Sequence, residues 1–253
     1  RYPKCYWVGN HRIWCLLQLN EHLLADWDYE LAIVLKLLEA DSRNFHGWQY
    51  RRWVVLMKEK AFVDSPSTLL DSVASEFAYT TMQINKNILN FSAWHQRLKL
   101  IPRLAELIID EPSSKHMAQL SQFSSPKAIL AHELELIKTG MYVDADDSSV
   151  WLYLEWLLTD PFFREADDEE MFRELLLDQL KIVDELNELE IDDDPQNREN
   201  IWCLKGMIFL HQRLREEAKK LVSKEEIELV ERLIKRDPLR EGRYKEQLAL
   251  LRG

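Results

Sequence analysis

An internal repeat constrains this chain more than any other feature of its sequence. The clearest copy reads NFHGWQYRRW at 44–53, a second reads NFSAWHQR at 90–97, and an upstream copy reads CYWVGNHRIW at 5–14. Weaker copies read VWLYLEW at 150–156 and NIWCL at 200–204. Aligned on the tryptophan position, the copies fall at 9, 48, 94, 151 and 202, in steps of 39, 46, 57 and 51 residues. Such steps are typical of helical hairpins joined by loops of variable length.

Tryptophan and arginine stand three residues apart in the stronger copies, so they share one face of a helix. A tryptophan buries roughly 150–250 Å² and can wedge between neighbouring hairpins. The arginine can cover this core with its aliphatic stem and offer its head to a carboxylate or a carbonyl. We interpret the repeated residues as structural, because repeat faces are more often core than ligand site. These residues are Arg12, Trp48, Arg51, Trp94, Arg97, Trp151 and Trp202.

Hairpins of this kind predict an all-α fold, a right-handed α-α superhelix like that of tetratricopeptide proteins, although their period is shorter. The 253 residues contain only 6 Gly and 8 Pro, which favours helices. We expect one domain over 1–253. The first copy opens directly with a second helix, so we also expect an N-terminal part of the domain to be missing. Repeats are predicted around 5–19, 29–60, 68–108, 127–160 and 168–216.

Three local signals refine these boundaries. Pro102 lies inside a predicted helix and is expected to kink or end it. Gly140 is expected to cap the end of the helix that starts near residue 127. The acidic stretch 191–199 is predicted to be a linker that follows a long amphipathic helix.

Charge and cysteine content limit the classes of partner and compartment. A formal net charge of −11 argues against binding of nucleic acid or anionic lipid and is compatible with basic protein partners. Cys5, Cys15 and Cys203 form no CxxC motif and no even framework, which is typical of a reduced, cytoplasmic setting. No apolar run reaches the roughly 20 residues that span a bilayer.

The usual sequence patterns of catalysis are absent. The chain has no glycine-rich phosphate loop, no HExxH, no GxSxG and no Cys/His spacing for zinc. His11 and His95 adjoin repeat arginines, and we interpret each as a structural histidine on a helix. The residues alone therefore predict a soluble helical solenoid.

The repeat motifs are more specific than the solenoid class. PKCY at 3–6 with HR at 11–12, and DSRNFHGWQYRR at 41–52, resemble the repeats of protein prenyltransferase α subunits. The resemblance covers nearly the whole chain, through WHQR at 94–97 to DPLR at 237–240. Within the family, the chain is more similar to Rab geranylgeranyltransferase (type II) α subunits than to the α subunit shared by farnesyltransferase and geranylgeranyltransferase type I.

This resemblance implies one subunit of an enzyme. Such an α subunit wraps helical hairpins around a β subunit, which holds the zinc and the lipid cavity, and no cofactor is expected in the α chain itself. The implied reaction transfers geranylgeranyl from geranylgeranyl diphosphate, bound at the subunit interface, to C-terminal cysteines of Rab GTPases presented by the Rab escort protein. Two alternatives stay open: a non-enzymatic protein-binding scaffold, and the α subunit of farnesyltransferase or geranylgeranyltransferase type I.

Four residues match family positions at the reaction site or the subunit interface. Lys4 matches the lysine that reaches the diphosphate, where an ammonium stabilises the charge on the leaving group. Tyr6 matches a tyrosine at the rim of that site, and Asn44 and His46 match residues that face the β subunit. Each has a plainer alternative: a solvated lysine, hairpin packing for Tyr6, an N-cap for Asn44, and an interface contact without chemistry for His46.

Two residues beside Lys4 depart from the family pattern. Gly9 stands where the family has tryptophan, and Trp7 where a small or polar residue is usual. A glycine within a helix costs about 1 kcal/mol relative to alanine. The missing ring is expected to leave a cavity unless Trp7 or Trp14 fills it.

Overall fold

The computed structural model describes residues 6–60, 65–110, 121–164 and 169–253. These residues form helices and short connections, and no strand occurs among them, which confirms the predicted all-α class. No helix within the described ranges has both the length and the apolar character needed to cross a membrane. The chain divides into two compact units, Arg1–Phe123 and Ser124–Gly253. Each unit is described by itself.

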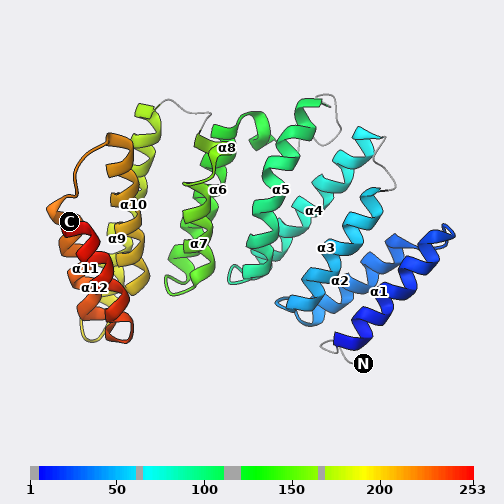
Figure 1. The fold of residues 1–253 in the computed structure, drawn as a ribbon, viewed down its shortest axis with the longest axis horizontal. Helices are drawn as coiled ribbons and strands as arrows, with labels where there is room; N and C mark the ends of the chain where they lie inside the picture. The colour runs from blue at the N-terminus through cyan, green and yellow to red at the C-terminus, as the bar shows by residue number, and fades with distance from the viewer. Residues whose placement is uncertain (1–5, 61–64, 111–120, 165–168) are drawn as a thin grey trace. The chain divides into compact units, whose positions relative to one another are not determined.

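The first unit is built of antiparallel helical hairpins preceded by one helix. Helix α2 packs against α3, and α4 packs against α5 (Figure 1). This arrangement places the second helix of each predicted repeat beside its own first helix. The helices are α1 (Tyr6–Glu21), α2 (Trp27–Ala40), α3 (Phe45–Lys60), α4 (Pro66–Lys86) and α5 (Phe91–Asp110).

The second unit continues the same construction. Helix α6 packs against α7, α9 against α10, and α11 against both α10 and α12. Its elements are α6 (Pro126–Val143), α7 (Ser148–Leu157), α8 (Pro161–Arg164), α9 (Glu169–Asp193), α10 (Ile201–Ala218), α11 (Lys224–Arg236) and α12 (Glu241–Arg252). A short 3-10 helix, η1, spans Ser121–Ser124, and another, η2, spans Pro238–Arg240.

Polar caps explain where several helices begin. The Asp26 Oδ1 atom accepts from the backbone N–H of Tyr29 at 2.9 Å, and the Asn44 Oδ1 atom accepts from that of Gly47 at 2.9 Å. Each bond satisfies a donor that has no partner inside its own helix. The same role is played by Ser125, Asp147, Asn200 and Ser223. The sequence therefore marks the start of these helices locally.

Three repeat tryptophans form the centre of the packing in one shared geometry. Trp48, Trp94 and Trp151 are buried, and each indole Nε1–H donates to a carbonyl six residues earlier, at 2.8, 2.7 and 2.9 Å. The accepting carbonyls belong to Ser42, Ile88 and Ala145. Each indole thus buries its rings and also binds the turn that joins the two helices of its hairpin.

The rings also reach the following hairpin, as a wedge requires. The centroid of Trp48 lies 5.7 Å from that of Tyr79 in α4. Trp151 of α7 lies against Gly206 of α10, where an added Cβ atom would stand 2.4 Å from the indole. Only a glycine at position 206 permits this close approach, because any side chain would overlap the ring.

Trp202 does not belong to this set, and its prediction as a repeat tryptophan is wrong in register. The buried repeat position lies four residues after the capping residue, as at Trp48 after Asn44. In α10 the cap is Asn200, so the equivalent position is Leu204, which is fully buried. Trp202 is half-buried and lies under the Nζ atom of Lys205 at 4.4 Å.

Local boundaries differ from prediction in three places. Pro102 was expected to kink or end its helix, and α5 does not end there but continues to Asp110. Helix α6 runs past Gly140 to Val143, and the backbone N–H of Asp144 makes the closing bond to the Gly140 carbonyl. Helix α9 reaches Asp193, so the first residues of the predicted linker are helical. In each case packing of a long amphipathic helix outweighs a local stop signal.

Candidate functional site

The first repeat arginine forms a two-pronged ion pair that joins α1 to α2. The Arg12 Nε and Nη2 atoms donate to the Glu30 Oε2 and Oε1 atoms at 2.7 and 2.6 Å. The hydroxyl of Tyr50 in α3 donates to the same Glu30 Oε2 at 2.7 Å. The hydrogen bond to Glu30 raises the pKa of Arg12, and burial together with Glu30 raises the pKa of Tyr50. One buried carboxylate therefore holds three helices.

The second repeat arginine joins α3 to the next hairpin. The Arg51 Nε and Nη2 atoms donate to Glu76 Oε2 and Oε1 of α4 at 2.9 and 2.6 Å, and both side chains are buried. The guanidinium also lies 3.5 Å above the ring centroid of Tyr79, whose pKa is raised by burial. Bidentate geometry and ring stacking both require arginine, so a lysine would not replace it.

The third repeat arginine contacts the first helix of its own hairpin. Arg97 of α5 is fully buried, and its Nη1 atom donates to Thr81 Oγ1 at 2.7 Å and lies 3.4 Å from Thr80 Oγ1. Its guanidinium lies 4.0 Å above the ring centroid of Phe77. These contacts tie α5 to α4 within one hairpin.

The acidic partners form a repeat of their own, which the sequence analysis missed. Glu30, Glu76 and Glu133 each lie 18 residues before a repeat tryptophan, and all three are buried. Glu133 accepts from the Tyr153 hydroxyl at 2.7 Å with the same spacing that joins Tyr50 to Glu30. The sequence contains this pattern as a glutamate 18 residues before each of the three tryptophans. The glutamate lies on the first helix of the hairpin, outside the motif that contains the tryptophan.

Between the last two repeats, both positions of the ion pair are apolar. Three residues after Trp151 stands Leu154, and eighteen residues before Leu204 stands Leu186. Both leucines are buried. The arginine and glutamate positions therefore change to apolar residues as a set.

Asn44 is used inside the first unit. The side chain is only 3% exposed, caps α3, and its Nδ2 atom lies 3.4 Å from Asp41 Oδ2. At the equivalent position, Asn90 donates to the Ser42 carbonyl at 2.9 Å and so binds the preceding repeat. This geometry supports the structural alternative for Asn44, and its predicted interface role stays a prediction.

The other residues predicted at the reaction site lie at the edge of the described chain. Lys4 and the side chain of Tyr6 fall outside the described residues, although Tyr6 begins α1. His46 is exposed at the first turn of α3, with its ring 5.6 Å from that of Phe45. Its exposure is compatible with contact to a partner.

Gly9 does not leave a cavity that a neighbouring tryptophan fills. A Cβ atom at Gly9 would meet no described atom within 4 Å. Trp7 and Trp14 are 79% and 58% exposed, so neither ring replaces the family tryptophan. This face of α1 is open within the described part of the unit.

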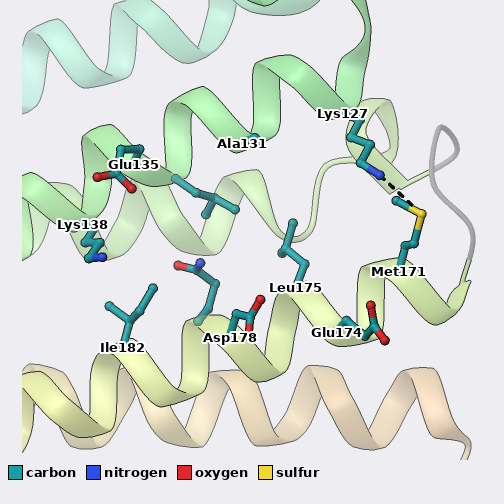
Figure 2. A pocket seen from close by; sticks show the side chains of 11 residues that line it. Lys127, Ala131, Glu135, Lys138, Met171, Glu174, Leu175, Asp178 and Ile182 are labelled. Atoms are coloured by element: carbon teal, nitrogen blue, oxygen red, sulfur yellow. Dashed lines mark hydrogen bonds between the residues drawn. The ribbon is translucent and has the colours of Figure 1, made fainter.

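A groove of about 320 Å³ lies between α6 and α9 of the second unit (Figure 2). Its apolar residues are accompanied by charged residues of both signs, and the Nζ atom of Lys127 lies 3.3 Å from the Met171 sulfur. Residues that line the groove include Lys127, Leu134, Lys138, Met171, Leu175 and Asp178. Nothing in this set pairs a nucleophile with a base.

The described side chains contain no evident metal centre, and one of the two described thiols is buried. No group of three or more His, Cys, Asp or Glu residues in the described ranges is placed to hold a metal ion. Cys203 is fully buried, and burial raises the pKa of its thiol to about 12. What this arrangement offers is a stiff array of hairpins that can position a partner.

Comparison with known proteins identifies the array. A family model described as protein prenyltransferase alpha subunit repeat matches residues 27–58 and 73–104, which are the hairpins α2–α3 and α4–α5. The geranylgeranyl transferase type-2 subunit alpha of Candida albicans is 41% identical over 260 residues, which cover 98% of this chain and 70% of that protein. The chain belongs to the protein prenyltransferase α-subunit family.

Other relatives carry the same name. The geranylgeranyl transferase type-2 subunit alpha of Saccharomyces cerevisiae is 38% identical over 96% of this chain and 68% of its own length. That of Mus musculus is 36% identical over 62% of this chain and 24% of its own length. These findings confirm the resemblance and favour the type-2 form over the α subunit of the CaaX enzymes. A member of this family works with a β subunit, as predicted.

Proposed function

We propose that this chain is the α subunit of a heterodimeric Rab geranylgeranyltransferase. The enzyme transfers geranylgeranyl from geranylgeranyl diphosphate to C-terminal cysteines of Rab GTPases. The observation that carries the proposal is the 41% and 38% identity, over nearly the whole chain, to proteins named geranylgeranyl transferase type-2 subunit alpha. A repeat scaffold without an enzymatic partner would share the hairpins but would not account for this identity.

In this proposal the two subunits divide the chemistry. The β subunit holds the zinc, which makes the acceptor cysteine a thiolate, and it encloses the lipid. The Rab escort protein presents the Rab tail. The α subunit is held rigid by its tryptophans and its Arg–Glu pairs, and it brings Lys4 and Tyr6 to the diphosphate. Cys15 and Cys203 are free thiols, which supports a reduced, cytoplasmic setting.

The direct test is reconstitution with a type-2 β subunit. The chain is co-expressed with this partner, purified through a tag on the partner, and assayed for transfer of labelled geranylgeranyl to a Rab protein in the presence of escort protein. The proposal predicts co-purification and transfer. A chain that does not co-purify and supports no transfer would leave the scaffold alternative standing.

The Lys4→Ala variant tests the diphosphate role. An ammonium that stabilises the leaving group contributes roughly 2–4 kcal/mol to the transition state if it resembles other such donors. We expect turnover to fall by about thirtyfold or more while the subunits still co-purify. The Lys4→Arg variant should recover part of the rate because it keeps the charge. Unchanged turnover in Lys4→Ala would reject the role.

A further inference from the structure

Helix α1 carries a thiol and an imidazole that stand one turn apart and touch. The Sγ atom of Cys15 lies 3.6 Å from the Nε2 atom of His11, within hydrogen-bond distance for sulfur. The indole of Trp14 stacks on the imidazole of His11, with ring centroids 5.8 Å apart and planes inclined by 19°. A nucleophile thus has a base within reach, and a third side chain holds that base in position.

Soluble reagents can approach this pair. His11 is exposed, Trp14 is 58% exposed, and Cys15 is half-buried. The other described free thiol, Cys203, is fully buried in the second unit. Reaction of a thiol depends on access as well as on loss of its proton. The two described thiols therefore differ in both respects, since only Cys15 has solvent access together with a neighbouring base.

The charges on α1 also suit a thiolate. The helix contains no acidic residue before Glu21 at its end, although the chain carries a formal net charge of −11. Its one arginine, Arg12, lies a turn before Cys15 and binds Glu30 of α2. Negative charge that forms on the sulfur therefore meets no carboxylate from the neighbouring turns of its own helix, and basic neighbours favour the thiolate form.

We propose that Cys15 is a redox modification site, which forms a mixed disulfide with a low-molecular-weight disulfide such as oxidised glutathione, and that His11 is its base. The Nε2 atom of His11 takes the thiol proton, and the Cys15 sulfur attacks one sulfur of the reagent. A new S–S bond forms as the old one breaks, and the displaced thiolate takes the proton from His11. Cys15 is oxidised, and one half of the reagent leaves as a reduced thiol.

Disulfide exchange suits this pair better than metal binding does. Two ligands are too few to hold a metal ion, and no third His, Cys, Asp or Glu completes such a group in the described parts of the chain. Exchange needs a group that first accepts a proton and then returns it, which one imidazole can do. In a reduced compartment the thiol persists, and the adduct forms when the share of disulfide rises. The inference does not rest on the proposed function.

Site-resolved mass spectrometry of the wild-type chain tests the proposal. The folded full chain is incubated with oxidised glutathione, and the fractions of Cys15 and Cys203 that carry a glutathionyl group are followed with time. We expect Cys15 to react at least about tenfold faster than Cys203, and the two rates to approach each other in urea. Excess reduced thiol should remove the adduct. No adduct at Cys15, or equal rates at the two thiols of the folded chain, would overturn the proposal.

The His11→Ala variant tests the base. We expect exchange at Cys15 to slow by about fivefold or more, and free imidazole added to the solution to restore part of the rate. His22→Ala is the matched control, because His22 is an exposed histidine just beyond the end of α1, and it should change the rate by less than about twofold. Circular dichroism checks that each variant is folded. An unchanged rate in His11→Ala, or a slow rate that imidazole does not restore, would reject His11 as the base.

Discussion

The arginine and glutamate positions of the repeat are filled with opposite chemistry in the first unit and in the last two repeats of the second. In the first unit, Arg12 and Arg51 bind Glu30 and Glu76 in pairs of short hydrogen bonds. At the corresponding positions of the last two repeats stand the buried residues Leu154 and Leu186. Both positions are apolar here, as expected if the arginine and the glutamate of the Arg12–Glu30 and Arg51–Glu76 junctions act as pairs.

An ion pair and a pair of leucines respond differently to substitution of one residue. A buried ion pair contributes little more than apolar residues of similar size, but removal of one partner leaves a buried charge. An apolar contact has no such charge, and it weakens in proportion to the cavity that a smaller side chain leaves. The Arg12 and Arg51 junctions should therefore be sensitive to single charge changes, and the positions of Leu154 and Leu186 to loss of volume.

The largest expected effect comes from breaking the Arg51–Glu76 pair. Arg51→Met leaves the Glu76 carboxylate buried and unpaired, and we expect it to lower the free energy of unfolding by about 3–5 kcal/mol. The double variant Arg51→Met/Glu76→Leu imitates the last repeat and should return to within about 1 kcal/mol of the wild type. Urea denaturation of the two single variants and the double variant measures this coupling. A double variant as unstable as Arg51→Met would contradict the comparison.

Truncation of a buried leucine at the apolar positions should lower the free energy of unfolding. We expect Leu186→Ala to cost about 2–4 kcal/mol, because Leu186 is 3% exposed and its removal leaves a cavity. Leu189→Ala on the same helix is the matched control, since Leu189 is 50% exposed, and it should cost less than about 0.5 kcal/mol. Equal losses for the two variants in urea denaturation would show that Leu186 does not fill the junction.

A third pair of variants compares the two tryptophan positions. Trp151→Phe loses the indole bond to the Ala145 carbonyl and part of the packing on Gly206, so we expect a cost of about 1–3 kcal/mol. Trp202→Phe should cost less than about 0.5 kcal/mol because this ring is half-buried and outside the repeat register. Thermal unfolding of both proteins checks the order, and the reverse order would restore Trp202 as a repeat residue.

The smallest effect is on pH dependence. The pKa of His95 lies below the ordinary value of about 6.5, so the unfolded chain takes up this proton first as the pH falls. Its contribution to stability is present above that value and is lost as the pH falls through the lowered pKa. His95→Gln should therefore reduce the acid-induced loss of stability by a few tenths of a kcal/mol, because the ring is partly exposed. Parallel pH profiles for wild type and variant would exclude this role.

The sequence predicted the features that repeat locally and missed those that depend on tertiary partners. The spacing of Trp48, Trp94 and Trp151 predicted the hairpins, and polar residues such as Asn44 marked helix starts. Trp202 was aligned with the repeat tryptophans because it stands near the expected position. Its burial depends instead on its distance from the capping residue Asn200, which places Leu204 at the buried position. Stop signals such as Gly140 failed because tertiary packing extends a helix beyond its local preference.

The candidate site was predicted less completely than the fold. The repeat spacing identified the arginines and the family resemblance identified the partner subunit, yet Glu30 and Glu76 were overlooked because they lie on the other helix of each hairpin. His95 was interpreted only as structural. Whether a charge has a partner becomes visible only when its environment is known; burial lowers the pKa of Arg52, for example.

Substrate choice by the assembled enzyme tests the proposed function most directly. The heterodimer of this chain and a type-2 β subunit is given labelled geranylgeranyl diphosphate together with a Rab protein bound to escort protein, or with a CaaX peptide alone. We predict that label enters the cysteines of the Rab tail and that the peptide is modified far more slowly. Efficient modification of the CaaX peptide without escort protein, or no transfer to the Rab protein, would contradict the account.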